Sequence, residues 1–324
     1  MNDQIRFGIM SCASIVPRFV RGLEECGLGT AAAIASRSGE KAQRTAEELN
    51  IPRAYGSYEA LLEDKDIEAV YIPLINSLHA PWAEKALLAG KHVIMEKPFV
   101  LHEAEAIRLA QLAEEKRLFI TEAVKTPFLP VYSRIKEILN EHALGEIRFM
   151  HFRQSYTGGS YITGWNTEKE SGGGVLIANE AYFFHMTEFL AGRIISCAGS
   201  ASFGPSVEDQ CSISVMTENN VLASLFVSSK VLFQNGLTIW LDHGRIEIPD
   251  YWKASEAFVY EADELKEHIS FPCRYEFRYE LEHYCRLIRE GCLQSPVTPV
   301  ANSGRYIGMC EQLYRQWEDG TRKP

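Results

Sequence analysis

The sequence predicts an α/β protein made of an N-terminal doubly wound domain and a C-terminal α+β domain with a large, mostly antiparallel open sheet. Two observations lead to this prediction. Over residues 1–122, short apolar segments alternate with helical patterns of about ten or more residues, which is typical of a parallel sheet with right-handed crossovers. Over residues 123–324, segments of alternating apolar and polar residues follow one another through short turns, which indicates antiparallel hairpins.

Composition narrows the class of protein before any motif is considered. Hydrophobic residues make up 46% of the 324-residue chain, enough for two cores, and the net charge of −10 argues against nucleic acid or an anionic membrane as a partner. The eight cysteines are scattered without zinc-type spacing, so no metal site is predicted and a reducing compartment is expected. No secretory signal and no apolar run near the ~20 residues of a membrane span are visible, so a cytoplasmic protein is expected.

The elements of the first domain follow from its apolar periodicity. The apolar segments predict strands over residues 5–10, 30–36, 67–74, 92–96 and 118–122. Helical patterns are predicted up to Cys26 and over about 39–49, 78–89 and 103–116.

The first strand-to-helix turn is where a doubly wound domain would hold a dinucleotide pyrophosphate, on amides at a helix N-terminus. The G-x-G-x-x-G fingerprint is degraded here: only a glycine upstream remains, and small residues replace the rest. The turn therefore fits either a dinucleotide site or an ordinary tight turn. Under the first interpretation the cofactor-binding residues are Gly8, Ser11, Cys12, Ala13, Ser14 and Ile15.

The end of the second predicted strand favours a particular cofactor. NAD sites usually place an acidic side chain there for the ribose hydroxyls, whereas this chain has Ser36 and Arg37. An arginine flanked by hydroxyls matches the 2′-phosphate of NADP, although a solvated surface arginine is the simpler alternative. We expect NADP to be preferred over NAD.

A third feature is the segment His92–Pro98, a short apolar strand that ends in Glu96-Lys97-Pro98. The carboxyl end of a strand in an open α/β sheet faces the ligand crevice, so Lys97 is expected to point toward whatever binds there. A surface turn with a solvated lysine is the alternative.

Several segments together resemble the glucose–fructose oxidoreductase/inositol dehydrogenase/MocA (Gfo/Idh/MocA) family, closest to the branch that contains dimeric dihydrodiol dehydrogenase and glucose–fructose oxidoreductase. They are Gly8–Ser11, Ala35–Arg37, Val70–His79, Gly90–His92, Glu96–Pro98 and the run Gly172–Gly174 with Tyr182 and His185. The resemblance runs almost end to end. It implies a Rossmann domain, a nicotinamide cofactor, and hydride transfer at a carbon that bears a hydroxyl.

The same resemblance implies roles for single residues in the first domain. Lys97 is similar to the active-site lysine of the family, and Glu96 to its neighbour at the cofactor. Leu74, Asn76 and His79 match positions beside the nicotinamide. The family often has a proline where this chain has Ile75, a change that alters the stiffness of the loop more than its chemistry.

In the second domain, a helix is predicted over about 129–142 and strands over 147–156, 194–203, 209–217, 220–229, 236–242 and 245–248. Turns at 218–220 and 242–244 join neighbouring strands as hairpins. The segment Val221–Val227 is apolar on both faces apart from Ser224, so the sheet needs a second partner. A homodimer through this sheet, or a thick core within the domain, would satisfy it.

The substrate side of the predicted site comes from the loop 156–174 and the helix after it. Trp165, Tyr161 and Lys169 are the visible candidates for substrate contact, and Trp165 equally fits an anchor for the loop. Tyr182 is similar to the tyrosine that serves as general acid and base in this branch, with Lys97 placing a positive charge beside it. His185 is expected to orient substrate or to be a buried helix histidine. Ala178 stands where the family usually has an aspartate.

The leading hypothesis is an NAD(P)-dependent oxidoreductase acting on a secondary alcohol of a sugar, polyol or cyclic diol. A cofactor-binding sensor that has lost catalysis is the second hypothesis, suggested by Ala178 and the degraded glycine turn. An enzyme that keeps its cofactor bound and moves hydride between two sugars is the third.

Overall fold

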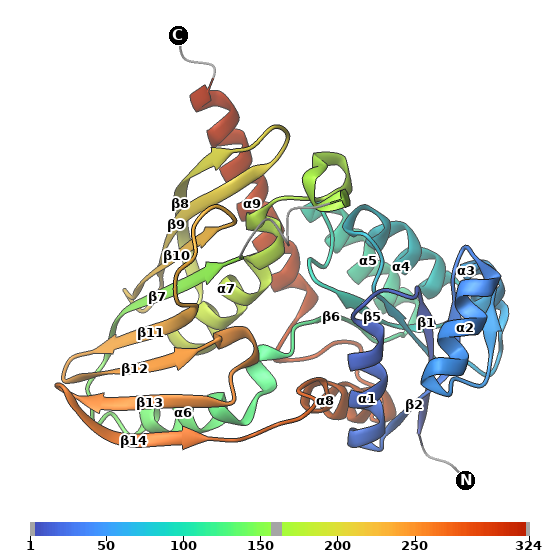
Figure 1. Ribbon diagram of the computed structural model, residues 1–324, viewed down its shortest axis with the longest axis horizontal. Helices are drawn as coiled ribbons and strands as arrows, with labels where there is room; N and C mark the ends of the chain where they lie inside the picture. The colour runs from blue at the N-terminus through green and yellow to red at the C-terminus, as the bar shows by residue number, and fades with distance from the viewer. Residues whose placement is uncertain (1–3, 157–163, 322–324) are drawn as a thin grey trace. The chain divides into compact units, whose positions relative to one another are not determined.

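The computed structural model describes residues 4–156 and 164–321, which form two compact units. The first unit contains residues up to Val124 and the later segment Tyr275–Arg305. The second contains Lys125–Arg274 and the residues from Tyr306 onward. Figure 1 labels the elements of both units.

The first unit is built on a six-stranded parallel sheet with the order β3-β2-β1-β4-β5-β6. This is the doubly wound order, and its chain reversal between β1 and β4 marks where ligands bind in such sheets. The strands are β1 (Ile5–Met10), β2 (Gly29–Ala35), β3 (Ala54–Tyr55), β4 (Ala69–Ile72), β5 (His92–Glu96) and β6 (Ile120–Ala123).

Helices connect these strands and pack on the sheet. They are α1 (Val16–Cys26), α2 (Gly39–Leu49), α3 (Tyr58–Glu63), α4 (His79–Leu88), α5 (Glu103–Lys116) and the returning α8 (Phe277–Arg289), which packs against α1. Local sequence fixes their ends: Ser38 and Ser57 cap α2 and α3, and Gly27 ends α1 with a left-handed φ of 68°.

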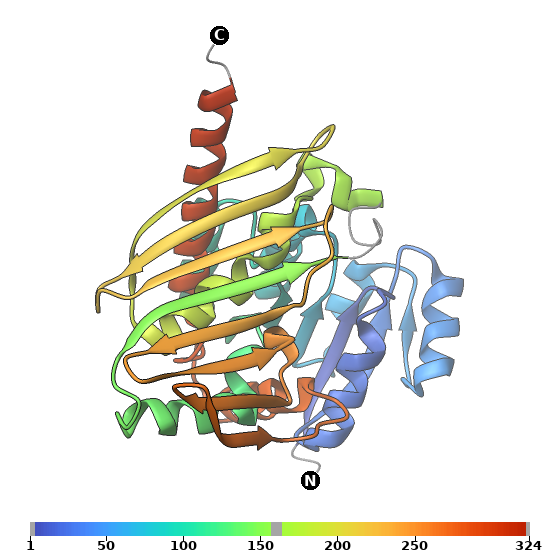
Figure 2. The ribbon, with the colours of Figure 1, turned by 60° about the vertical axis from the view of Figure 1, so that its left-hand side comes forward.

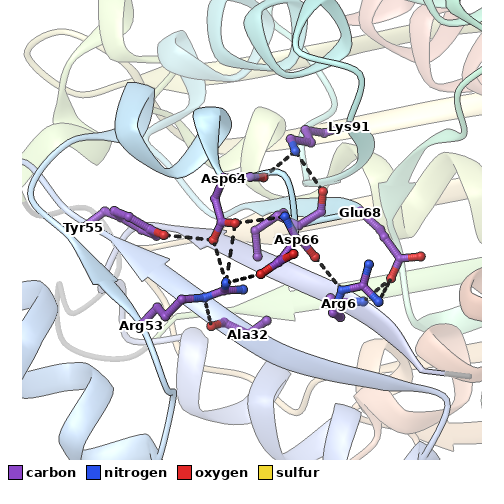
Figure 3. A network of polar contacts seen from close by, with 9 residues as sticks. Arg6, Ala32, Arg53, Tyr55, Asp64, Asp66, Glu68 and Lys91 are labelled. Atoms are coloured by element: carbon purple, nitrogen blue, oxygen red, sulfur yellow. Dashed lines mark hydrogen bonds and ion pairs between the residues drawn. The ribbon is translucent and has the colours of Figure 1, made fainter. Parts of the chain in front are cut away.

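A polar network ties together the starts of β1, β4 and β5 (Figure 3). Arg53 pairs with Asp64 and Asp66, and the Lys91 ammonium donates to the carbonyls of Asp64 and Ile67 at 2.7 and 2.8 Å. Burial lowers the pKa of Lys91, and its two carbonyl acceptors offset part of the desolvation cost. This network lies at the opposite strand ends from the predicted ligand crevice, so its role is to stabilise the unit.

The second unit is built on an eight-stranded sheet with the order β14-β13-β12-β11-β7-β10-β9-β8. Neighbouring strands are antiparallel except β7 and β10, which are parallel. The strands are β7 (Ile147–Ser155), β8 (Ile194–Phe203), β9 (Glu208–Thr217), β10 (Leu222–Ser228), β11 (Gly236–Leu241), β12 (Gly244–Pro249), β13 (Glu256–Glu261) and β14 (Glu264–Ser270).

The two faces of this sheet differ. Helix α7 (Val175–Ala191) contacts β7, β8, β9 and β10, and α6 (Pro130–Asn140) contacts β14, while α9 (Val300–Thr321) is the closing helix. Figure 2 shows the other face of the sheet turned toward the viewer, without a described helix of the unit in front of it. That face carries a half-buried aromatic row in which Phe149 stacks on Trp240 and His151, with ring centroids 5.4 and 6.1 Å apart.

The expected fold class is confirmed, and so are the hairpin turns at 218–220 and 242–244. Four elements were not expected from the sequence: β3, the short α3, and the two strands of the edge pair β13–β14. The segment Tyr275–Arg305 returns to the first unit. This return depends on long-range packing, so no local sequence pattern predicts it.

Helix α7 begins against a buried carboxylate. Glu208 is 1% exposed, and its carboxylate accepts hydrogen bonds from the Leu176 amide at 2.8 Å and from the Tyr314 hydroxyl at 2.9 Å. A negative group at a helix N-terminus is favourable, and Gly174 has no Cβ that would meet it. Burial nevertheless raises the pKa of Glu208 to about 7.

We predict that Glu208 makes the protein less stable as the pH rises. Between the pKa of an unfolded glutamate, about 4.3, and the folded value the native state binds more protons, so the free energy of unfolding falls by up to about 3 kcal/mol. Glu208→Gln keeps an acceptor oxygen but cannot titrate. Urea unfolding from about pH 4 to about pH 8 should therefore show wild type losing stability relative to the variant; parallel curves would contradict the prediction.

Candidate active site

Ser11 stands directly after β1, at the chain reversal of the sheet. Its φ of 152° lies in a region that favours glycine, at the position where the dinucleotide fingerprint has its first glycine. The Ser11 hydroxyl donates to the Pro73 carbonyl at 2.9 Å and accepts from the Ala13 amide at 3.1 Å. These two bonds hold a non-glycine residue in a glycine-type turn and join the ends of β1 and β4.

The turn then presents the start of α1. Ile15 is the N-cap and offers no side-chain cap, while Ser14 is exposed. Among the described residues, the amides of Ser14 and Ile15 have no hydrogen-bond partner, so they are available for an anion. The predicted contacts of Gly8, Cys12 and Ala13 lie along the same turn, although Gly8 is buried inside β1 against Leu61.

The residues after β2 have two different roles: Ser36 and Ser38 make hydrogen bonds within the turn, whereas Arg37 is exposed. Ser36 is 9% exposed and its oxygen accepts from the Ser38 amide, while Ser38 in turn caps α2 by accepting from Lys41. Arg37 is exposed, and within residues 4–156 and 164–321 its guanidinium has no ion pair or hydrogen bond. Burial raises the pKa of Tyr58, and the positive charge of Arg37 partly opposes that rise. Arg37 is thus available for a ligand.

The loop after β4 buries the two polar residues predicted near the nicotinamide. Asn76 is 7% exposed and begins a single 3-10 turn, and His79 is fully buried at the start of α4. The Nδ1 of His79 lies 2.7 Å from the Pro98 carbonyl and its Nε2 lies 3.1 Å from the Leu74 carbonyl. Burial lowers the pKa of His79. The ring therefore links the loops after β4 and β5, and its effect on a ligand would pass through those loops.

Lys97 lies at the carboxyl end of β5 and is half-buried, followed by a cis peptide bond to Pro98. Its neighbour Glu96 accepts from the Tyr71 hydroxyl at 2.5 Å and from the Lys97 amide at 3.3 Å. The Tyr71 ring itself is buried in a stack on Phe19 with centroids 3.7 Å apart. Glu96 is thereby fixed at the sheet end.

Glu122 is a site-supporting residue that the sequence analysis missed. It is 1% exposed, and its carboxylate accepts from the Phe99 amide at 2.8 Å and from the Ser303 hydroxyl at 2.6 Å. The Tyr284 hydroxyl donates to its backbone carbonyl at 3.0 Å. The only signal in the sequence was a glutamate at the end of an apolar strand, the same kind of anomaly that drew attention to Lys97.

In the second unit, α7 is buried on all sides over its first three turns, as expected for a helix that is apolar all round. Within Val175–Thr187, Tyr182 is the one residue that is not buried. The ammonium of Lys125 donates to the Tyr182 hydroxyl at 3.3 Å and lies 5.1 Å from the ring centroid. Lys125 is 5% exposed and was not among the predicted site residues.

The other predicted residues of this unit lie in different surroundings. His185 is 3% exposed and packs edge-on against Tyr306 at 4.8 Å, so its ring belongs to the packing layer. Trp165 is half-buried in a short 3-10 turn (Gly164–Thr167), and Lys169 is exposed and pairs with Glu318. Tyr161 lies outside the described residues.

A cavity of about 370 Å³ in the first unit does not coincide with these groups. It lies between α5 and the first turns of α9, with Ala106, Ala110 and Gly304 among its lining residues. None of the predicted site residues lines it, so the strand ends remain the candidate site. In the described part of the chain, no cluster of histidine, cysteine or acidic residues could hold a metal ion.

The residues of the first unit fit a dinucleotide. Two amides at the start of an 11-residue helix, open as far as the described chain goes, suit a pyrophosphate, and the Arg37 guanidinium, which pairs with no described residue, suits a further phosphate. This donor set lies at the sheet reversal, the usual position for such a cofactor. The fold and the site define an α/β enzyme of the dinucleotide-dependent class.

Comparison with known families agrees with this class. A family model described as an oxidoreductase family with an NAD-binding Rossmann fold matches residues 5–124, and the corresponding C-terminal domain of GFO/IDH/MocA proteins matches residues 132–247. The chain belongs to the Gfo/Idh/MocA oxidoreductase family.

Individual relatives cover most of the chain. The trans-1,2-dihydrobenzene-1,2-diol dehydrogenase of Xenopus tropicalis is 28% identical over 324 residues, which span 96% of this chain and 97% of the relative. A 3-ketoreductase from Actinomadura kijaniata, solved with NADP and TDP-benzene, is 25% identical, with a TM-score of 0.84 and coverage of 96% and 97%. Levoglucosan dehydrogenase in complex with NADH and levoglucosan has a TM-score of 0.87 at 19% identity, with coverage of 98% of both chains.

No helix in residues 4–156 or 164–321 has the length and apolar character required to cross a membrane.

Proposed function

We propose that this protein is an NADP-preferring oxidoreductase that acts on a secondary alcohol of a sugar, polyol or cyclic diol. The observation that carries the proposal is the phenol of Tyr182, the one residue within Val175–Thr187 of α7 that is not buried, held beside a lysine ammonium. Its support comes from the family to which the chain belongs and from relatives named as a diol dehydrogenase and as sugar reductases.

The cofactor would be held by the first unit. The amides of Ser14 and Ile15 would bind the pyrophosphate, and Arg37 the 2′-phosphate, while Ser36 and Ser38 shape that turn through their internal bonds. Glu96, Leu74 and Asn76 line the neighbouring strand ends, with His79 holding their loops. When bound, the nicotinamide supplies the acceptor or donor of a hydride.

The substrate hydroxyl would be handled by Tyr182 and Lys97. Tyr182 removes the hydroxyl proton during oxidation and returns it during reduction, and Lys97 stabilises the negative charge that develops on the same oxygen. Lys97 and Tyr182 belong to different units, and their joint action is taken from the family resemblance. Trp165 is proposed to contact the substrate from its loop, and His185 to support α7 through its packing on Tyr306.

We further propose a homodimer through the uncovered face of the eight-stranded sheet, in the cytoplasm. The aromatic row of Phe149, His151 and Trp240 is half-buried on that face, where isolated monomers usually place polar residues. All eight cysteines are free thiols, which suits a reducing compartment.

Replacing Lys97 tests the catalytic assignment. Lys97→Ala should reduce turnover by at least about 100-fold, because the charge on the reacting oxygen loses its stabilising cation, while NADPH still binds. Turnover is measured by NADPH absorbance and binding by NADPH fluorescence. Lys116→Ala, which removes an exposed lysine of the same unit, is the matched control. Full activity of Lys97→Ala on a confirmed substrate would exclude the assignment.

Replacing Arg37 tests the cofactor preference. Arg37→Ala should weaken NADPH binding about 10-fold to 100-fold and leave NADH binding nearly unchanged, because only NADPH carries the 2′-phosphate. Calorimetric titration with both nucleotides measures this, and Arg44→Ala on the following helix is the control for loss of a nearby positive charge. Equal weakening of both nucleotides would refute the 2′-phosphate contact.

Replacing Trp240 tests the dimer. Wild type should sediment as a dimer, and Trp240→Glu as a monomer, since a charge cannot be buried there without a partner. Leu88→Glu is the control, because Leu88 is 58% exposed on α4 in the other unit. A wild-type monomer in sedimentation velocity, or an unchanged dimer in Trp240→Glu, would count against the sheet interface.

A further inference from the structure

Lys125 is a second lysine with a defined chemical partner, apart from the family lysine at position 97. Its ammonium donates to the Tyr182 hydroxyl at 3.3 Å and lies 5.1 Å from the Tyr182 ring centroid. At 5% exposure the side chain is almost fully removed from water, so its charge acts on Tyr182 in a low-dielectric environment. A surface lysine near a phenol would be far less effective.

The backbone around Lys125 is fixed by several bonds. Lys125 precedes a 3-10 turn, Thr126–Phe128, whose Phe128 amide donates to the Lys125 carbonyl at 3.0 Å. The Thr126 hydroxyl donates to the Trp252 carbonyl at 3.1 Å, and the turn packs against α7. The backbone that carries the Lys125 ammonium is therefore fixed, and the turn that follows it packs against α7.

Several tyrosines lie near Tyr182. Tyr251, on the turn Tyr251–Lys253, interacts electrostatically with Tyr182, Tyr156 and Tyr132. Burial raises the pKa values of Tyr251 and Tyr132, so both remain neutral phenols. Tyr156 is engaged at 2.9 Å by the Asn179 side-chain oxygen, to which it donates.

The charged and thiol groups on the strand side of α7 interact with residues other than Tyr182. Glu208 of β9 bonds to Leu176 and Tyr314, and the thiols of Cys197 and Cys211 couple to Glu208 and Cys310. On α7 itself, Glu180 couples to Cys310, and His185 packs on Tyr306. Ala178, one turn before Tyr182, brings no carboxylate to that face. Lys125 is thus the cation whose hydrogen bond to Tyr182 the structure defines.

We propose that Lys125 is a positioning residue for the reaction, which holds the Tyr182 hydroxyl and stabilises its phenolate. The proposal rests on the proposed function of Tyr182. In oxidation, the substrate O–H bond breaks, its proton passes to the phenolate oxygen, and the electron pair of the adjacent C–H bond leaves as hydride to the nicotinamide. In reduction the same proton returns to the substrate oxygen, and the Lys125 ammonium stabilises the phenolate left behind.

The test compares Lys125→Met, which keeps the length of the side chain and removes its charge, with Lys125→Arg, which restores the charge. Carbon-13 labelling of the tyrosine Cζ, with Tyr182→Phe to assign the signal, follows Tyr182 deprotonation by NMR without any substrate. In Lys125→Met the midpoint of that titration should move up by about one pH unit or more, and in Lys125→Arg it should return most of the way. NADPH binding, measured by fluorescence, should be the same in all variants.

Kinetics provides the second readout. With a substrate found by screening sugars and diols, the pH profile of kcat for oxidation should shift upward in Lys125→Met by the same amount as the NMR midpoint. KM should change less than kcat. Absence of any reaction in wild type, combined with a shifted NMR midpoint, would reject the proposed function and leave the Lys125–Tyr182 coupling established.

An unchanged midpoint in Lys125→Met, with native-like NADPH binding, would overturn the proposal that Lys125 acts on Tyr182. If Lys125→Met does not fold, Lys125→Gln and Lys125→Arg take its place. Loss of activity in Lys125→Arg equal to that in Lys125→Gln would then assign Lys125 a purely structural role and reject the proposal.

Discussion

The backbone after Lys97 is held by two buried polar groups, and the chemistry of the first unit depends on them. The Glu122 carboxylate accepts from the Phe99 amide, and the His79 ring contacts the Pro98 carbonyl. Both side chains are essentially without water, and a hydrogen bond to a charged group contributes roughly 1.5–3 kcal/mol, so the turn has little freedom to move. Lys97 therefore emerges from a fixed backbone at the end of β5, which would suit the role proposed for it in stabilising a developing charge.

In the second unit, a buried helix holds the backbone of Tyr182 in place. Because α7 is buried on almost every side, its orientation is set by packing and by the Glu208 carboxylate at its start, and Tyr182 is the one residue of Val175–Thr187 that is not buried. The absence of a carboxylate at Ala178 suggested a weakened site when only the sequence was considered. The contact from Lys125 offers another interpretation, because the positioning role proposed for Lys125 does not require the missing acid.

The sequence predicted what depends on local pattern and could not predict what depends on long-range packing. Strands β1 and β5 and helices α2 and α5 matched closely because their periodicity and flanking residues mark their ends. The roles of His79 and Glu122 were not visible, because their partners Pro98, Leu74 and Phe99 lie 5 to 23 residues away. Lys125 was missed for the same reason: its partner is 57 residues away, and only the fold brings the two together.

The proposed function requires that hydride move between the substrate carbon and a nicotinamide while Tyr182 transfers the proton. The most direct measurement uses a substrate deuterated at the carbon that bears the hydroxyl, with NADP and the wild-type protein. We expect mass spectrometry to show the deuterium on the nicotinamide ring of the NADPH formed. The Tyr182→Phe variant should form almost no deuterated NADPH. Deuterium released to water, or transfer that continues undiminished in Tyr182→Phe, would contradict the proposed function.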